Sequence, residues 1–261
     1  MTTITRDPPV PSTPGGGPID SATQSLRAAS LIAGTGILLL AVLAVFGNFI
    51  AVGALVTRGD AATTARDILA SEGLFRWGVA SLILVAVLDI VVARALLTVF
   101  EPVNRSVSAM AAWFRVAYAV VFLVGIGQLV VALGLLGDPT QALRAIDTYT
   151  AIWNAALVLF AVHLLLIGYL TYRSGFVPRV IGILLVASGL GYLTDGFGVV
   201  LVPGYSLSIA QFTFVGEVAL IIWLLVKGVR MTSAPAVPAP VPQTQDDNDS
   251  GRNGRLARTR S

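Results

Sequence analysis

The chain has 261 residues, of which 56% are hydrophobic and only 12% are charged, about half the charged share of a soluble domain. A water-soluble fold cannot cover this much apolar surface, and the absence of cysteine excludes disulfides, thiolate metal sites and thiol catalysis. The net charge of +3 does not indicate nucleic-acid binding, because the arginines lie at the ends of apolar segments and in the C-terminal tail.

Six apolar segments are long enough to cross a bilayer, since a helix rises about 1.5 Å per residue and a hydrocarbon layer about 30 Å thick needs roughly 20 residues. The sequence therefore predicts an all-α protein, a polytopic transmembrane bundle occupying 26–230. The tails, 1–25 and 231–261, are rich in Pro and polar residues and are expected to be disordered. The expected spans are 28–56, 74–99, 109–136, 150–172, 178–202 and 206–229.

The longest connection, 57–73, is expected to form a short helix lying on the membrane surface. Asp60 can cap this helix through its carboxylate, and Ser71 can cap the second span through its hydroxyl. This segment is therefore predicted to be ordered.

Turn signals separate the later spans. Gly-Asp-Pro at 137–139 ends the third span, and Pro178 begins the fifth at a position where a missing N–H is harmless. The fifth span carries glycines seven residues apart, a seam that lets a neighbouring helix approach closely. These are Gly182, Gly189 and Gly196.

Basic residues predict the orientation. With the N-terminus inside, the inner segments hold thirteen Lys and Arg residues and the outer segments four, so the positive-inside rule places both termini in the cytoplasm. The four outer residues are Arg58, Arg66, Arg76 and Arg144.

Three ionisable residues lie deep in the predicted spans: Asp89, His163 and Glu217. Counted from the outer ends of their spans they share one layer, roughly 15–20 Å deep. Since an unpaired charge there costs about 2.5–3.5 kcal/mol, we expect partners on other helices. A second polar group lies nearer the outside, and we expect both groups to line one outward-facing cavity. The second group is Asn48, Gln128, Asn154, Tyr192, Asp195 and Gln211.

The ligand candidates from this argument are Asp89, His163, Asp195, Glu217, Tyr192 and Gln128. Buried polar side chains often only hold helices in register, so a structural role stays open beside a proton-transfer or ligand-binding one. One histidine offers little scope for a metal site, and no serine is placed to form a catalytic triad with it. No catalytic residue, metal or cofactor is therefore expected.

Several phrases, taken together, resemble the bacterial membrane proteins of the domain-of-unknown-function 4386 family, over roughly residues 26–230. The resemblance implies a six-helix membrane domain and assigns no activity. The phrases are Gly59-Asp60-Ala61-Ala62-Thr63, Ile68 to Arg76, Asp89, Pro102-Val103-Asn104-Arg105-Ser106, Phe114-Arg115, His163-Leu164, Gly168-Tyr169-Leu170, Tyr172 to Phe176, Pro178-Arg179, Gly182, Gly191-Tyr192-Leu193, Asp195, Glu217 and Trp223 to Gly228.

These observations predict a multi-pass protein of the bacterial plasma membrane, in contact with the lipid bilayer, of unidentified activity and oligomeric state. Three classes of function stay open. A transporter-like or sensing protein would use the deep acids and His163 in a proton-linked small-molecule site. An enzyme acting on a lipid-like substrate would need a lateral opening, and the sequence favours a non-enzyme without deciding the matter. A structural protein would have its polar groups fully paired.

Overall fold

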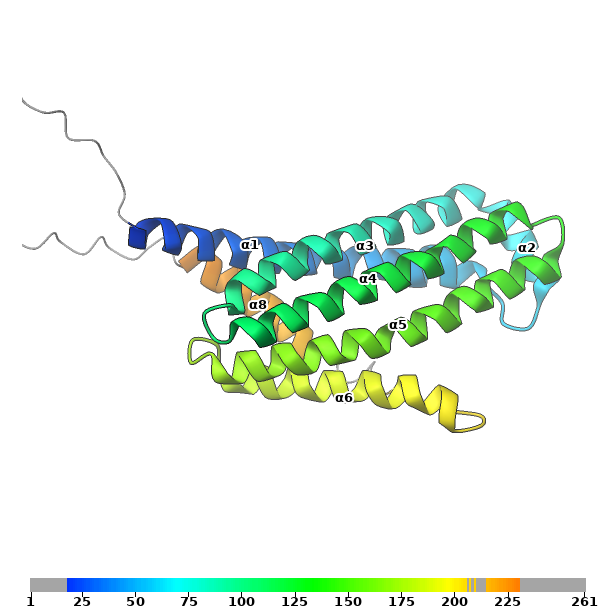
Figure 1. Cartoon of the computed structure of the whole chain (residues 1–261). Coiled ribbons are helices and arrows are strands. Elements are labelled where there is room, and N and C mark those ends of the chain that lie inside the picture. Colours follow the sequence, from blue (N-terminus) through cyan, green and yellow to red (C-terminus); the bar gives the residue numbers. More distant parts are fainter. Residues whose placement is uncertain (1–17, 206, 208, 210–214, 231–261) are drawn as a thin grey trace, which may run out of the picture.

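The computed structural model describes residues 18–205, 207, 209 and 215–230. Within them every regular element is helical, which confirms the predicted all-α class. The long helices are α1 (Pro18–Val45), α3 (Glu72–Phe100), α4 (Arg105–Gly134), α5 (Pro139–Arg173), α6 (Arg179–Leu201) and α8 (Val215–Arg230), and α2 (Ala61–Ala70) is short (Figure 1).

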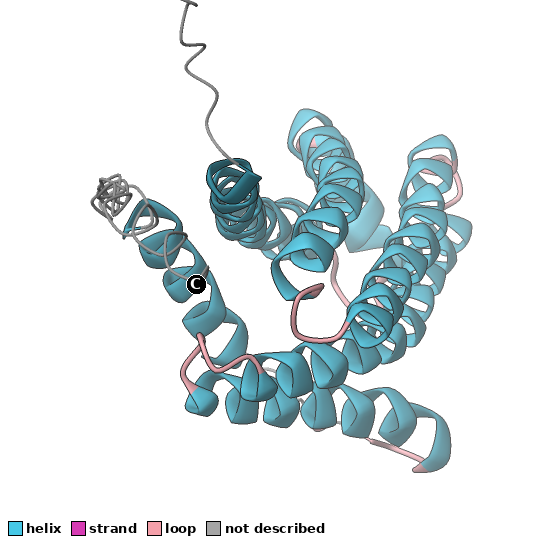
Figure 2. Ribbon diagram, turned by 60° about the vertical axis from the view of Figure 1, so that its left-hand side comes forward, coloured by secondary structure: helices cyan, strands magenta, loops and turns pink. Residues whose placement is uncertain are grey.

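The six long helices surround a common axis. Each packs against the next in the order α1, α3, α4, α5, α6 and α8, and α8 packs back against α1, so the contacts close into a ring. Figure 2 shows the helices grouped in this way, with the end that carries the described termini turned forward. A polar residue on the inner face of any of these helices is therefore removed from the surrounding lipid.

The outward faces of the ring are apolar. Trp77 is 72% exposed, and Val200 and Leu201 are 79% and 71% exposed. Five helical segments are long and apolar enough to cross a membrane, as expected of a protein that places such side chains against lipid. They are Gln24–Leu55, Glu72–Phe100, Arg105–Gly134, Pro139–Arg173 and Arg179–Leu201.

The sixth expected span, 206–229, falls partly outside the described residues. Its described part, α8, has 16 residues and is about 24 Å long, shorter than the hydrocarbon layer. The count of six spans therefore stays a prediction, as does disorder in residues 1–17 and 231–261, which also lie outside the description.

Two helix starts differ from expectation. α1 begins at Pro18 instead of residue 28, and α5 begins at Pro139 instead of residue 150. α5 starts early because the Asp138 carboxylate accepts a hydrogen bond from the backbone N–H of Gln141, 3.2 Å away, with proline at the first position. Its 35 residues extend about 52 Å, so part of α5 projects beyond the apolar layer and packs against α2.

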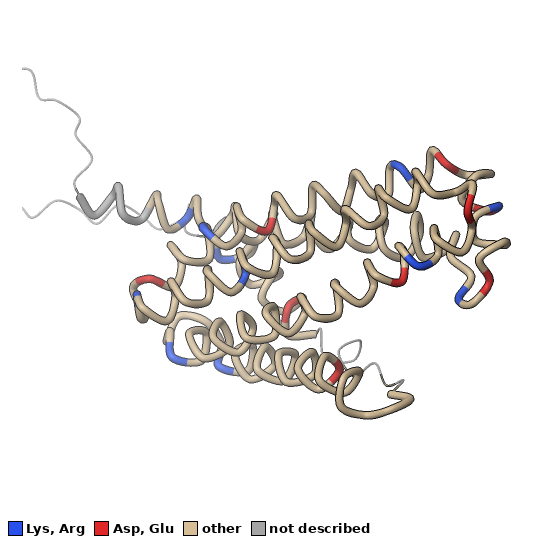
Figure 3. The backbone as a smooth tube through the Cα atoms, turned by 45° about the vertical axis from the view of Figure 1, so that its right-hand side comes forward, with Lys and Arg blue, Asp and Glu red and all other residues tan. Residues whose placement is uncertain are grey.

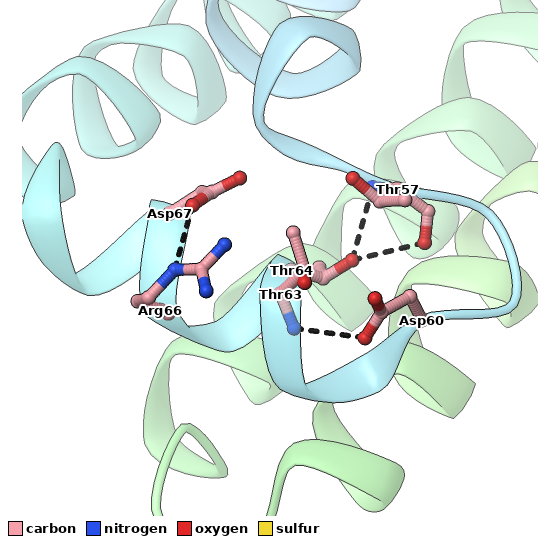
Figure 4. Close-up of polar contacts among 6 residues, drawn as sticks. All are labelled: Thr57, Asp60, Thr63, Thr64, Arg66 and Asp67. Atoms are coloured by element: carbon pink, nitrogen blue, oxygen red, sulfur yellow. Dashed lines mark hydrogen bonds and ion pairs between the residues drawn. The ribbon is translucent and has the colours of Figure 1, made fainter.

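The short helix predicted in 57–73 is confirmed as α2, its position on the membrane surface stays a prediction, and Figure 4 shows how the helix begins. Asp60 Oδ1 accepts a hydrogen bond from the Thr63 N–H at 2.9 Å, and this contact lowers the pKa of Asp60 below its ordinary value. The Thr64 hydroxyl bonds to both the N–H and the C=O of Thr57, at 3.0 and 3.1 Å. The predicted cap by Ser71 is wrong: its side chain makes no capping bond, because α2 runs into α3 with only this residue between them.

The chain departs from regular α-helix at the end of α1. Phe46–Val52 forms a π-helix and Gly53–Leu55 a 3₁₀ turn, where the sequence predicted a continuous span to residue 56. A Cβ at Gly47 would lie 2.6 Å from Leu82 Cδ2, so α1 and α3 approach closely here. The wider π turn also carries Asn48, whose side chain accepts a hydrogen bond from the Tyr149 hydroxyl of α5.

The glycine seam on α6 is confirmed, and it faces α5. A Cβ at Gly182 would lie 2.7 Å from the Gly168 carbonyl oxygen, and one at Gly189 would lie 2.9 Å from the carbonyl of Ala161. Side chains on these glycines would push α6 away from α5. The seam thus sets the close α5–α6 contact.

A candidate axial proton site

A buried ion pair joins α3 and α4 at the centre of the ring. Arg115 Nη2 lies 2.6 Å from Asp89 Oδ1, and the two side chains are 6% and 4% exposed. Arg115 is ten residues into α4, about 15 Å from its start. Far from water, a carboxylate and a guanidinium at this distance neutralise each other's charge.

Arg115 also holds His163 of α5. Its Nη1 lies 3.1 Å from His163 Nε2, and because a guanidinium has only donors, Nε2 must accept. The other ring nitrogen, Nδ1, lies 2.9 Å from the Ala111 carbonyl oxygen and therefore carries the hydrogen. His163, which is 1% exposed, is thus the neutral Nδ1–H tautomer.

The guanidinium rests on an aromatic group. Its Cζ lies 5.4 Å from the centroid of the Phe160 ring, within the range of a cation–π contact. Phe160 in turn contacts the rings of Tyr118, His163 and Tyr192 at centroid distances of 5.0, 5.7 and 5.7 Å. Further rings, Phe122, Tyr149 and Trp153, continue this packing along α4 and α5.

Glu217 reaches the same centre from α8. The Tyr192 side chain of α6 interacts with its carboxylate, and Arg115 lies close enough for the two charges to interact. Its Oε1 is buried and has no hydrogen-bond partner among the described residues, and the same holds for Arg115 Nε. The cluster is therefore incompletely paired among the described residues.

A small cavity lies between these groups. About 20 Å³ of it is open to the centre of a water molecule, enough for one water and far less than a metabolite needs. Every long helix contributes to its wall, which places it on the axis of the ring. One residue from each helix in turn is Ile37, Leu96, Arg115, His163, Leu185 and Glu217.

The expected deep residues are thus brought together, although not as direct pairs. Asp89 and His163 meet through Arg115, and Glu217 shares the cavity with Arg115 and His163. Because all three contact or face the same guanidinium, they form one site. We call Asp89, Arg115, His163 and Glu217 the axial cluster.

The outer polar residues do not line this cavity. Asp195 accepts hydrogen bonds from the Tyr205 hydroxyl at 2.6 Å and the Ile209 N–H at 3.0 Å, which orders the chain after α6. The contact raises the pKa of Tyr205 to about 12. Gln128 is half-buried on α4, thirteen residues beyond Arg115 and so about 20 Å away along the helix.

The expected cavity shared by inner and outer groups is therefore not present among the described residues. Aromatic rings pack between α4 and α5, two of the helices that were expected to line it. Tyr192 connects the two layers, through Phe160 and Glu217. Gln211 lies outside the described residues.

Sequence reasoning missed Arg115, which it counted as an inner interfacial cation. A signal was available in the spacing. Asp89 lies thirteen residues before Pro102, in the α3–α4 turn, and Arg115 thirteen after it. In an antiparallel helical hairpin with a short turn, residues equally far from the turn in sequence lie at the same depth. Arg115 and His163 are likewise equally far in sequence from Pro139, at the turn between α4 and α5.

Comparisons with known proteins find a family and a relative. The family described as "Domain of unknown function (DUF4386)" matches residues 32–228, which contain the whole axial cluster. An "Uncharacterized protein" from Archaeoglobus fulgidus is 30% identical over 165 residues, covering 62% of this chain and 90% of that protein. No solved structure matches the chain. By the extent of the family match, the chain belongs to the DUF4386 family, a group defined without an activity.

Proposed function

We propose that the protein is a proton-linked, transporter-like protein of the bacterial plasma membrane that binds a small molecule. It has six spans, and both termini are cytoplasmic. The observation that carries the proposal is the charge balance of the axial cluster. One guanidinium faces two carboxylates, and the third ionisable neighbour, His163, is held neutral by its hydrogen bonds.

The charge balance assigns the proton to Glu217. Asp89 already forms an ion pair with Arg115 at 2.6 Å, so a second ionised carboxylate would leave one negative charge without a cation inside the bundle. A proton on Glu217 makes the cluster neutral. Ionisable residues inside a membrane mark proton and substrate pathways in many transport proteins, which supports a proton-linked role here.

The small-molecule part of the proposal requires movement. The axial cavity accommodates only one water, so a larger ligand binds only after helices separate around it. α8 supplies Glu217 and, among the described helices, packs mainly against α1 and α6. Displacement of α8 would open the cavity without breaking the Asp89–Arg115 pair, and the ligand would then reach the proton-binding carboxyl.

Infrared spectroscopy of the purified protein at varied pH tests the proton site. We expect a protonated-carboxyl band that responds to pH, disappears in Glu217→Gln and persists in Glu72→Gln, a control that removes a half-exposed carboxylate paired with Arg76 at 2.6 Å. If no such band exists, or if it survives in Glu217→Gln, the proposal is wrong.

The linkage to a ligand is tested by thermal stability across a panel of metabolites at two pH values. A ligand whose stabilisation depends on pH in the wild type, and no longer does so in Glu217→Gln, supports the proposal. A structural protein would instead lose stability in Asp89→Asn and Glu217→Gln without any ligand response. A ligand that stabilises equally at both pH values would refute proton linkage.

Two features support the topology. The described chain starts and ends at the same end of the bundle (Figure 1), and charged residues lie mostly toward the ends of the helices (Figure 3). Because the chain has no cysteine, single cysteines can report sidedness. Gly137→Cys and Pro203→Cys should react with an impermeant thiol reagent in intact cells, and Pro102→Cys should not; the opposite pattern would reverse the orientation.

A further inference from the structure

Three buried polar atoms of the axial cluster make no hydrogen bond among the described residues: Asp89 Oδ1, Arg115 Nε and Glu217 Oε1. Asp89 Oδ1 is ion-paired with Arg115 Nη2 at 2.6 Å, which leaves one donor, Arg115 Nε, and one acceptor, Glu217 Oε1. They come from α4 and α8, and both residues line the axial cavity. A buried polar group left unpaired destabilises a protein by about 1–3 kcal/mol, and more if it is charged. Two such atoms on residues that line one cavity therefore indicate an occupant that pairs both.

The other polar groups around the cavity are already engaged. His163 uses both ring nitrogens, on Arg115 and on the Ala111 carbonyl. Asp89 of α3 is paired with Arg115, and Tyr192 of α6 faces Glu217. α1 contributes an apolar side chain. An occupant thus meets one free donor and one free acceptor.

These groups select the chemistry of the occupant. An anion would be repelled by the carboxyl oxygen, and a cation by the guanidinium. A water molecule both accepts and donates, and two polar partners suffice for a buried water. The open volume of about 20 Å³ exceeds the roughly 10–15 Å³ that one water needs.

We propose that one water molecule occupies the axial cavity, accepting a hydrogen bond from Arg115 Nε–H and donating one to Glu217 Oε1. The site itself depends only on the described geometry. Its role in activity, coupling the charge state of Glu217 to the arginine that holds α3, α4 and α5 together, rests on the proposed function.

Nuclear magnetic resonance of protein labelled with ¹⁵N-arginine, in micelles, tests the site. The Nε–H signal of Arg115 is assigned by its loss in Arg115→Lys. In the wild type we expect through-space magnetisation transfer from water to this proton. The transfer is measured in the rotating frame, so that it can be distinguished from chemical exchange of the proton with water. The transfer should persist in Glu217→Gln, whose amide oxygen still accepts a hydrogen bond.

Two variants should abolish the transfer. Leu220→Phe fills the cavity from α8, and Glu217→Leu removes the acceptor. Ile222→Phe, which enlarges a residue on the same helix that is 57% exposed, is the matched control and should keep the signal. If Leu220→Phe does not fold, Glu217→Leu decides the question by itself.

The proposal is overturned if the wild type shows no transfer, or if the transfer survives in the folded cavity variants. These results are distinguishable from failure of the proposed function. A pH-responsive Glu217 band without water transfer would refute the water site alone. Water transfer without that band would refute the proton site alone.

Discussion

The Asp89–Arg115 ion pair gives the sharpest prediction of stability. At 2.6 Å and an effective dielectric constant of about 20, the attraction between the two charges is about 6 kcal/mol. Removing each ion from water costs several kcal/mol, so the net contribution of the pair is small. Removing one partner, however, leaves the other charge buried, which destabilises by about 3–5 kcal/mol.

The two single variants should differ, for a chemical reason. In Arg115→Leu, the remaining Asp89 carboxylate can bind a proton and become neutral. In Asp89→Leu, the guanidinium cannot lose its proton and loses its directly paired carboxylate, which leaves the contacts with His163 and Phe160 and the more distant Glu217. We therefore expect Asp89→Leu to lower the free energy of unfolding by about 5 kcal/mol and Arg115→Leu by about 3 kcal/mol. The free energy of unfolding of the double variant should lie within about 1–2 kcal/mol of that of the wild type.

A double-mutant cycle measures these effects. The free energy of unfolding of all four proteins is determined in mixed micelles by titration with a denaturing detergent. The predicted singles correspond to a loss of roughly 10²- to 10⁴-fold in the folded-to-unfolded ratio, since about 1.4 kcal/mol is tenfold. If Arg115→Leu is the more harmful single variant, or if the double variant equals the sum of the singles, the reasoning is refuted.

Three further predictions concern single positions. His163→Leu should destabilise by about 1–3 kcal/mol, because an Arg donor and a backbone carbonyl lose their partner; thermal unfolding should show a smaller loss in His163→Gln, and equal losses would contradict the assigned hydrogen bonds. Gly189→Val should destabilise by about 1–3 kcal/mol by overpacking against α5, whereas Gly127→Val, with nothing within 4 Å of a new Cβ, should change little in the same assay. Folding lowers the pKa of Asp60 from its ordinary 3.8, so the stabilisation by its cap is fully present above pH 3.8 and is lost as the pH falls through the lowered pKa. The amide-exchange protection factor of Thr63 should therefore drop over that pH range in the wild type but not in Asp60→Asn. A drop in both proteins would rule out the carboxylate as the cause.

The depth of the candidate residues was predictable, but their partners were only partly so. Helical rise converts a residue count into a depth, which is why Asp89, His163 and Glu217 were placed in one layer. Arg115 was not placed in this layer, because an arginine near the end of a span was interpreted as a cytoplasmic contact that sets the orientation. Arg115 and Asp89 each lie thirteen residues from Pro102, and this equal spacing predicts a shared depth once the α3–α4 turn is known to be short.

The outer polar residues show the opposite case. Asp195 and Gln128 satisfied the same rule of polarity within an apolar span, yet Asp195 orders the chain after α6 and Gln128 lies far along α4 from the axial cluster. A pattern along one helix specifies depth and a rough face. It does not specify whether a neighbouring helix brings a partner, an aromatic ring or lipid to that face.

The sequence by itself determined the helical class, the positions of most of the long apolar helices, the short helix capped by Asp60 and the glycine seam of α6. Each of these depends on contacts within a few residues or on the periodic placement of apolar and small side chains. The tertiary structure alone decided that α8 closes a ring with α1, that Arg115 joins Asp89 to His163, and that the axial cavity is the size of one water. These features depend on the rotation and spacing of helices far apart in the chain, which are set by packing across the whole bundle.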